Sequence, residues 1–228
     1  MSSIAANLIE VRRRIVEAAC ASGRDPADIT LAAVSKMHSE EAIREAYAAG
    51  QRHFAENYAQ HLRDKSVALQ DLPDLKWHFI GHLQRNKIKY VVAAKALVET
   101  VDSVELAGEL NTACGRAGAV LECLVQVNVG REPQKSGVLA EQAAAVIDAV
   151  SSADNLRLTG LMTIPPYDLE PEETKKHFKA LRELRDAMGG ATRLPCLSMG
   201  MSGDFPEAVA EGATIVRVGT AIFGHRNI

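Results

Sequence analysis

Short apolar segments alternate with longer amphipathic ones along almost the whole chain. Eight segments rich in apolar and β-branched residues predict strands, at Thr30–Ser35, Arg52–Ala55, Trp77–Gly81, Leu97–Val101, Glu122–Asn128, Arg157–Ile164, Pro195–Met199 and Thr214–Val218. Between them, apolar residues at helical spacing predict helices over Glu40–Ala49, Tyr58–Leu69, Leu83–Ala94, Val104–Ala117, Leu139–Ser151, Glu172–Met188 and Phe205–Ala210. A further amphipathic helix is expected before the first strand, where Ile4, Leu8, Val11, Ile15 and Ala18 recur.

This alternation predicts an α/β fold, a single (β/α)8 TIM barrel over residues 1–228 with an extra N-terminal helix. The main alternative is a doubly wound open sheet, which usually has a Gly-rich turn after its first strand. Here Lys36-Met-His-Ser follows that strand, without the G-x-G-x-x-G pattern. No linker, low-complexity tract or short repeat divides the chain, so we expect one domain.

Composition limits the classes of partner and the compartment. The 228 residues include 26 Lys+Arg and 29 Asp+Glu, a net charge of −3 that predicts no attraction to nucleic acid or to anionic membranes. The four cysteines are scattered, as is typical of reduced thiols in a cytoplasmic protein. The N-terminus lacks a signal-peptide pattern, and no apolar run approaches the ~20 residues of a membrane span. We expect a cytoplasmic monomer.

Lys36 closes the first predicted strand. Its ammonium would lose hydration there, which lowers the pKa of a lysine and frees the amine to form a Schiff base with a carbonyl. The alternative is a strand-end lysine whose stem lies on apolar surface while its head reaches water.

Two glycine-containing loops follow the last two predicted strands, Ser198–Asp204 and Arg217–Gly224. In a barrel these loops commonly bind phosphate, through backbone N–H groups and hydroxyls such as that of Ser202. In the alternative, Ser202 and Asp204 only cap the next helix and Gly219 only turns the chain.

Arg217 lies between apolar neighbours in the last strand, on the same face as Ile215 and Gly219. If that face points into the lumen, the buried guanidinium needs a partner, either a ligand acceptor or a carboxylate such as Glu56 or Glu99. A Schiff-base lysine, a phosphate site and an arginine at one end of a barrel fit the aldehyde, phosphate and ring nitrogen of pyridoxal 5′-phosphate (PLP).

The sequence also resembles the pyridoxal phosphate homeostasis proteins (the YggS/PROSC family) over nearly the whole chain. The resemblance lies in a series of ordered motifs: Ala33–Lys36, Phe54–Tyr58, Trp77–Gln84, Asn128–Gly137 with Lys135, Gly160–Pro165, Ser198–Ser202 and Val216–Gly224. It implies a fold related to the N-terminal barrel of alanine racemase (fold type III of the PLP proteins). It also implies a covalent aldimine on Lys36, a phosphate site at Ser202, Gly219 and Thr220, Arg217 facing the pyridine nitrogen, and Asn57 among the cofactor-binding residues.

The resemblance further implies an intracellular PLP carrier or reservoir that influences amino-acid and keto-acid balance, with apo PLP enzymes as recipients and without an established turnover reaction. Three positions depart from the pattern common in the family: Ala55, His38 and His61 stand where glycine, a second lysine and glutamate are frequent. The loss of an amine at position 38 puts in doubt a cofactor transfer that uses it.

A PLP-dependent racemase or decarboxylase is the alternative function. Racemisation on this barrel needs a tyrosine base from a second domain, and the chain ends at Ile228, so we expect Tyr58 and Tyr167 to be the only tyrosines near the ligand. A class I aldolase acting on sugar phosphates is a third possibility. His78 and His82 have the spacing of a zinc pair but fall in strand and turn, so no metal is expected. Lys135, in a polar loop after the fifth strand, is expected to be exposed unless the family resemblance gives it a role. His82, at a strand end, could hydrogen-bond near the ligand.

Overall fold

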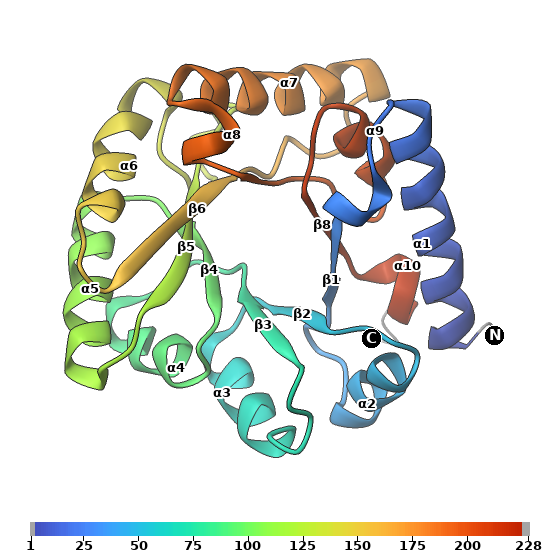
Figure 1. Ribbon diagram of the computed structural model, residues 1–228, viewed down its shortest axis with the longest axis horizontal. Coiled ribbons are helices and arrows are strands. Elements are labelled where there is room, and N and C mark those ends of the chain that lie inside the picture. The colour runs from blue at the N-terminus through green and yellow to red at the C-terminus, as the bar shows by residue number, and fades with distance from the viewer. Residues whose placement is uncertain (1–2, 225–228) are drawn as a thin grey trace.

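Eight parallel strands form a closed barrel in the computed structural model, which describes residues 3–224 (Figure 1). The strands are β1 (Thr30–Val34), β2 (His53–Glu56), β3 (Lys76–Phe79), β4 (Leu97–Val101), β5 (Leu121–Gln126), β6 (Leu156–Met162), β7 (Cys196–Ser198) and β8 (Ile215–Val218). Each pairs with its successor, and β1 pairs with β8, with Ala33 opposite Val218. The predicted barrel is therefore confirmed, and the open sheet is excluded.

Helices surround the barrel in the predicted order. They are α1 (Ile4–Ala21), α2 (Glu40–Ala48), α3 (Ala59–Ala68), α4 (Ile88–Ala93), α5 (Val104–Ala117), α6 (Ala143–Ser151), α7 (Pro171–Ala187), α8 (Gly190–Arg193), α9 (Phe205–Ala210) and α10 (Thr220–Phe223). Short 3-10 turns at Pro26–Asp28, Arg85–Lys87 and Ala140–Gln142 precede β1, α4 and α6. The sequence pattern did not predict α8, because Gly189 and Gly190 indicate a helix end and do have positive φ, but the chain starts another turn at once.

Two separate apolar layers follow from the alternation of side chains along the strands. The larger layer lies between the strands and the helices. A smaller one fills part of the lumen and contains only aliphatic and thioether side chains: Ala32, Val34, Ala55, Leu124, Met162 and Ile215. Ile215 and Arg217 lie on the same face of β8, so this layer also establishes that Arg217 points into the lumen.

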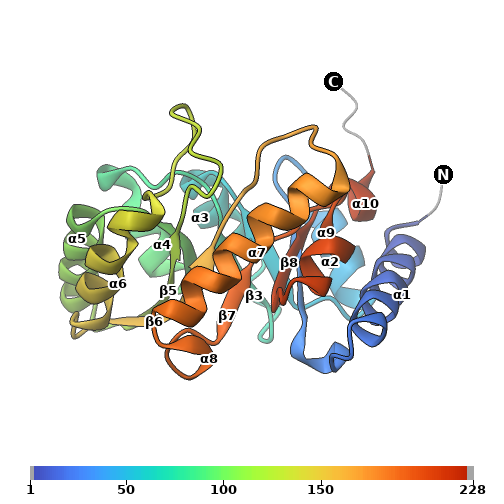
Figure 2. The same cartoon turned by 90° about the horizontal axis from the view of Figure 1, so that it is seen from above.

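The N-terminal helix α1 completes the outer ring. It packs against α2, α9 and α10 (Figure 2). Its Asn7 Nδ2 donates to the carbonyl of Ile222 at 2.8 Å. α10 has only 4 residues, and α1 covers the side of the barrel that this short helix leaves open. α1 is amphipathic, and none of the helices among residues 3–224 combines the length and apolar character needed to cross a membrane.

Candidate functional site

The carboxyl ends of the strands meet at one end of the barrel, which we call the mouth. Lys36 follows β1, Asn57 follows β2, Ser202 lies in the loop after β7, and Gly219 and Thr220 follow β8. β1 and β8 are hydrogen-bonded neighbours, and a Cβ built on Gly219 would lie 3.3 Å from Val34 Cβ. The structure therefore brings the predicted lysine and the predicted phosphate loops to the same rim.

The segment that carries Lys36 is anchored on the helix side. Ser35 is buried, and its hydroxyl donates to Glu56 Oε1 at 2.6 Å. Lys65 of α3 donates from Nζ to the same Oε1 at 2.7 Å and to the Ser35 carbonyl at 2.9 Å. These bonds fix the backbone just before Lys36, which is half-buried in the turn that follows. They also hold Glu56 on the helix side of the barrel, so it is not the carboxylate that faces Arg217.

Ser202 joins the two predicted phosphate loops. Its Oγ accepts from the backbone N–H of Gly219 at 3.2 Å and of Ala221 at 3.4 Å. Asp204 stands at the N-cap of α9 but makes no side-chain bond to that helix; it accepts from the Met201 N–H instead, and burial raises the pKa of its carboxyl. The helix-capping alternative is therefore wrong, and a hydroxyl and two N–H groups lie together at the mouth.

Arg217 lies deep in the lumen and has several acceptors. Its Nη1 donates to Ser198 Oγ at 2.6 Å and lies 3.8 Å from Glu99 Oε2, while Nη2 donates to the Thr163 carbonyl at 2.8 Å. Burial lowers the pKa of the guanidinium, and the charge of Glu99 opposes that effect. Of the two carboxylates considered, Glu99 is the partner.

Glu99 links Arg217 to two histidines that sequence reasoning did not place in the site. It accepts from Ser198 at 2.5 Å and from His78 Nδ1 at 2.6 Å, and His78 Nε2 lies 2.9 Å from His53 Nδ1. Burial alone would raise the pKa of Glu99, but the His78 hydrogen bond and the charges of His78 and Arg217 lower it below its usual range. The available signal was period-two alternation, which points the polar residues of β2, β3, β4, β7 and β8 inward.

The histidine pair considered for zinc does not form. His78 is buried in the lumen beside Glu99, whereas His82 is exposed after β3. Among residues 3–224, no group of three or more His, Cys, Asp or Glu side chains is placed to bind a metal ion.

Asn57 has an unsatisfied acceptor. Its Oδ1 is buried and has no hydrogen-bond partner among the described residues. Gly81 packs directly against it, since a Cβ at position 81 would lie 2.0 Å from the Asn57 carbonyl oxygen. Buried polar atoms in folded proteins are generally paired, so this orphan is a candidate contact for a bound group.

Lys135 connects two loops at the mouth, and the expectation that it is exposed is wrong. Its Nζ donates to the Pro165 carbonyl at 2.9 Å, lies 2.6 Å from Glu132 Oε2 and sits 4.8 Å from the ring centroid of Tyr167. Its side chain is only 18% exposed. Tyr167 and Tyr58, in contrast, are 68% and 53% exposed, so both rings border the open end.

Comparisons with known proteins identify the family of this chain. The family model described as "Alanine racemase, N-terminal domain" matches residues 3–227. The pyridoxal phosphate homeostasis protein of Pseudomonas aeruginosa is 45% identical over 227 residues, covering 100% of this chain and 97% of the relative. The corresponding human protein is 38% identical and covers 95% of this chain and 84% of the relative.

Solved structures of related proteins have the same barrel fold. PipY of Synechococcus elongatus with PLP bound is 40% identical, with a TM-score of 0.84 over 97% of this chain and 100% of that one. An alanine racemase of Clostridium difficile is 17% identical with a TM-score of 0.75, and the match covers 99% of this chain and 57% of the racemase. The second likeness concerns the fold alone.

Proposed function

The chain belongs to the pyridoxal phosphate homeostasis protein family, whose barrel is that of the alanine racemase N-terminal domain, and on this premise we propose that it binds PLP reversibly. It acts as a cytoplasmic carrier or reservoir of the cofactor, supplies apo PLP enzymes, and so influences amino-acid and keto-acid balance. The observation that carries this proposal is the meeting, at one end of a closed barrel, of a lysine, two hydroxyl-bearing loops and a luminal arginine.

The residues at the mouth fit the three chemical handles of the cofactor, which offers an aldehyde, a phosphate and a ring nitrogen. In this proposal the amine of Lys36 adds to the aldehyde carbon and water leaves, giving a covalent aldimine. Ser202, Gly219 and Thr220 bind the phosphate, and Arg217 faces the ring nitrogen. The unpaired Oδ1 of Asn57 supports a bound group on the β2 side of the mouth.

A carrier is favoured over a racemase by the chain's own side chains. An arginine donates to the ring nitrogen and keeps it unprotonated, which weakens the electron sink that carbanion chemistry requires. Tyr58 and Tyr167 are more than half exposed, so water reaches both phenols. Exposure of this kind suits exchange of a bound ligand better than protection of a carbanion.

The test is borohydride reduction of PLP-loaded protein followed by peptide mapping. We expect a pyridoxyl group on the Lys36 peptide, its loss in Lys36→Ala, and its retention in the matched control Lys176→Ala, on the outside of α7. A persistent adduct elsewhere in Lys36→Ala, at the level of the unaltered chain, would remove the role of Lys36.

Carrier function is tested by transfer. Unreduced, loaded protein is expected to restore activity to an apo PLP enzyme, and the borohydride-reduced protein is expected not to. Rapid deuterium exchange at the α-carbon of a free amino acid would instead indicate a racemase. Light scattering of the loaded protein checks the expectation of a monomer.

A further inference from the structure

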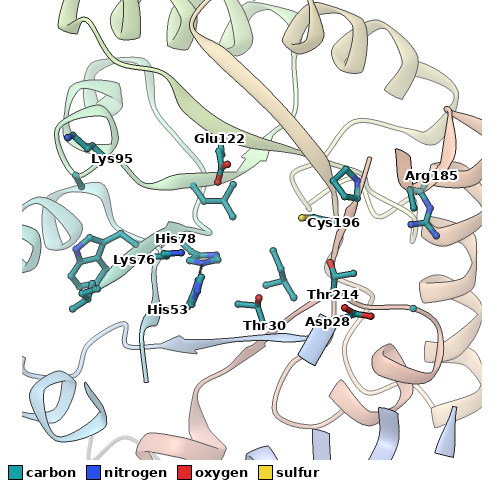
Figure 3. A pocket seen from close by; sticks show the side chains of 18 of the residues that line it. Asp28, Thr30, His53, Lys76, His78, Lys95, Glu122, Arg185, Cys196 and Thr214 are labelled. Carbon is teal, nitrogen blue, oxygen red and sulfur yellow. Dashed lines mark hydrogen bonds between the residues drawn. The ribbon is translucent and has the colours of Figure 1, made fainter. Parts of the chain in front are cut away.

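A cavity of about 820 Å³ opens at the end of the barrel opposite the mouth (Figure 3). It is lined by the first residues of several strands, among them Thr30, Lys76 and Leu97, and we call it the floor cavity. Its charged lining residues are Arg24, Asp28, Lys76, Lys95, Glu122 and Arg185, which are four cations and two anions. The excess of positive charge favours an anionic ligand.

Several of these charges already have partners. Arg24 donates to the carbonyls of Val209 and Ala213 at 2.7 and 2.8 Å, Arg185 pairs with Asp186 at 2.6 Å, and Glu122 lies 3.6 Å from Arg157. Lys76, on β3, is close enough to His53 for its charge to oppose protonation of that ring. A cation and a ring nitrogen meet in the part of the cavity beside His53 and Lys76, which makes this part receptive to an anion.

The hydrogen-bond chain dictates how His53 can meet a ligand. Glu99 is an ionised acceptor, so His78 Nδ1 carries a hydrogen. With His78 neutral, its Nε2 accepts from His53 Nδ1–H, and His53 Nε2 is then a bare acceptor. An oxyanion needs a donor. His53 Nε2 can become one only if the His53 and His78 pair gains a proton, because in a neutral pair neither of the two nitrogens between the rings would then carry a hydrogen.

The surroundings of His53 disfavour a positive charge on its ring when no anion is present. Burial is the main cause, followed by repulsion from His78 in its protonated form and from Lys76, and together they lower the pKa of His53 to about 4, against a weaker opposite effect of Glu99. A bound oxyanion would lie against the same ring and the same lysine. Its negative charge would compensate the charge of Lys76 and that of the protonated histidine pair. It would therefore favour protonation of the pair.

We propose that the floor cavity is a second binding site, for a small phosphate- or carboxylate-bearing molecule, and that its occupation places one proton on the His53 and His78 pair. The chain His53, His78, Glu99, Ser198 and Arg217 connects this site to the mouth. When the pair is protonated, His78 competes with Arg217 for the charge of Glu99. The connection to the cofactor rests on the proposed function; the anion site does not.

Histidine NMR of the full chain tests the site, with inorganic phosphate and acetate as probes and His53→Gln to assign the signals. Loaded, borohydride-reduced protein is used so that the mouth is filled; Ser202→Ala without cofactor serves if loading fails. We expect saturating phosphate or acetate to raise the apparent pKa of the pair by about one unit, a tenfold change in proton affinity. The larger of the two responses identifies the head group.

Lys76→Ala is expected to remove most of this rise of about one pKa unit, which is a factor of about ten in proton affinity. Lys176→Ala, on the outside of α7, is its matched control and is expected to leave the response unchanged. Equal titration curves in phosphate, acetate and chloride at one ionic strength would overturn the anion site. If the floor cavity affects the mouth, cofactor bound at the mouth must in turn shift the titration of the His53 and His78 pair. An identical titration curve before and after verified loading would overturn the connection.

Discussion

Arg217 donates from Nη1 to the Oγ of Ser198 at 2.6 Å, which joins the neighbouring strands β8 and β7 inside the barrel. The same hydroxyl donates to Glu99 on β4, so it lies between a buried cation and a buried anion. We expect Ser198→Ala to lower the free energy of unfolding by about 2 kcal/mol, because both charged groups lose a partner. Urea unfolding measures this. Ser66→Ala, in which the lost hydroxyl lies on α3, is the control, and equal stabilities of the two variants would contradict the prediction.

Ser202 bridges the loops after β7 and β8, so its removal should weaken cofactor binding. Hydrogen bonds to charged groups contribute about 1.5–3 kcal/mol, and we expect Ser202→Ala to raise the Kd for PLP at least about tenfold. Absorbance titration of the protein without cofactor gives the Kd. Ser152→Ala, at the end of α6, should match the unaltered chain. An unchanged Kd in Ser202→Ala would place the phosphate elsewhere.

Stability is expected to depend on pH through His53. Its pKa falls from an ordinary 6.5 to about 4 in the folded chain, mainly through burial. Between these two values the unfolded chain binds the proton more readily, so the free energy of unfolding decreases as the pH falls from 6.5 toward 4. Above that window the contribution is constant. Urea unfolding at several pH values should show the slope, and His53→Gln should reduce it; identical slopes in the two proteins would disprove the assignment.

Lys135 connects the loop after β5 with the loop after β6 through the Pro165 carbonyl. In Lys135→Ala this contact is lost, and we expect faster amide hydrogen exchange across residues 128–137 and in the segment around Pro165. Global stability should change by no more than about 1 kcal/mol, since both partners lie in loops that can open locally without unfolding the barrel. Mass spectrometry of the exchange checks the result, with Lys176→Ala as the control. Equal exchange rates of the two variants in these segments would argue against the contact.

Two glycines offer a matched test of close packing in the barrel. A Cβ at Gly160, on β6, would lie 1.9 Å from the Cys196 carbonyl oxygen, whereas a Cβ at Gly108, in α5, meets nothing within 4 Å. We expect Gly160→Ala to destabilise the protein by about 3 kcal/mol or more, as overpacking does. Gly108→Ala should instead stabilise it by about 0.5–1 kcal/mol, because alanine favours the helix. Thermal unfolding of the two variants measures these changes. A Gly160→Ala variant as stable as the unaltered chain would mean that β6 and β7 separate easily.

The sequence alone determined the order and nature of the elements. Strand and helix periodicities are local properties, so the eight strands are found within a few residues of their predicted bounds. The same alternation assigned Arg217 to the face of Ile215 and Gly219, and topology then brought Lys36, Asn57, Ser202, Gly219 and Thr220 to one rim. Parallel strands leave no other arrangement for residues that follow them.

Only the tertiary structure decided which side chains meet across the lumen. Glu56 and Glu99 were equally plausible partners of Arg217, and the pleat directs Glu56 to Lys65 on the helix side and Glu99 to the interior. The bond between His53 and His78, and the contact of Lys135 with Pro165, depend on strand register and loop path. Such contacts join positions far apart in the chain, and local patterns contain no information on the distances between them.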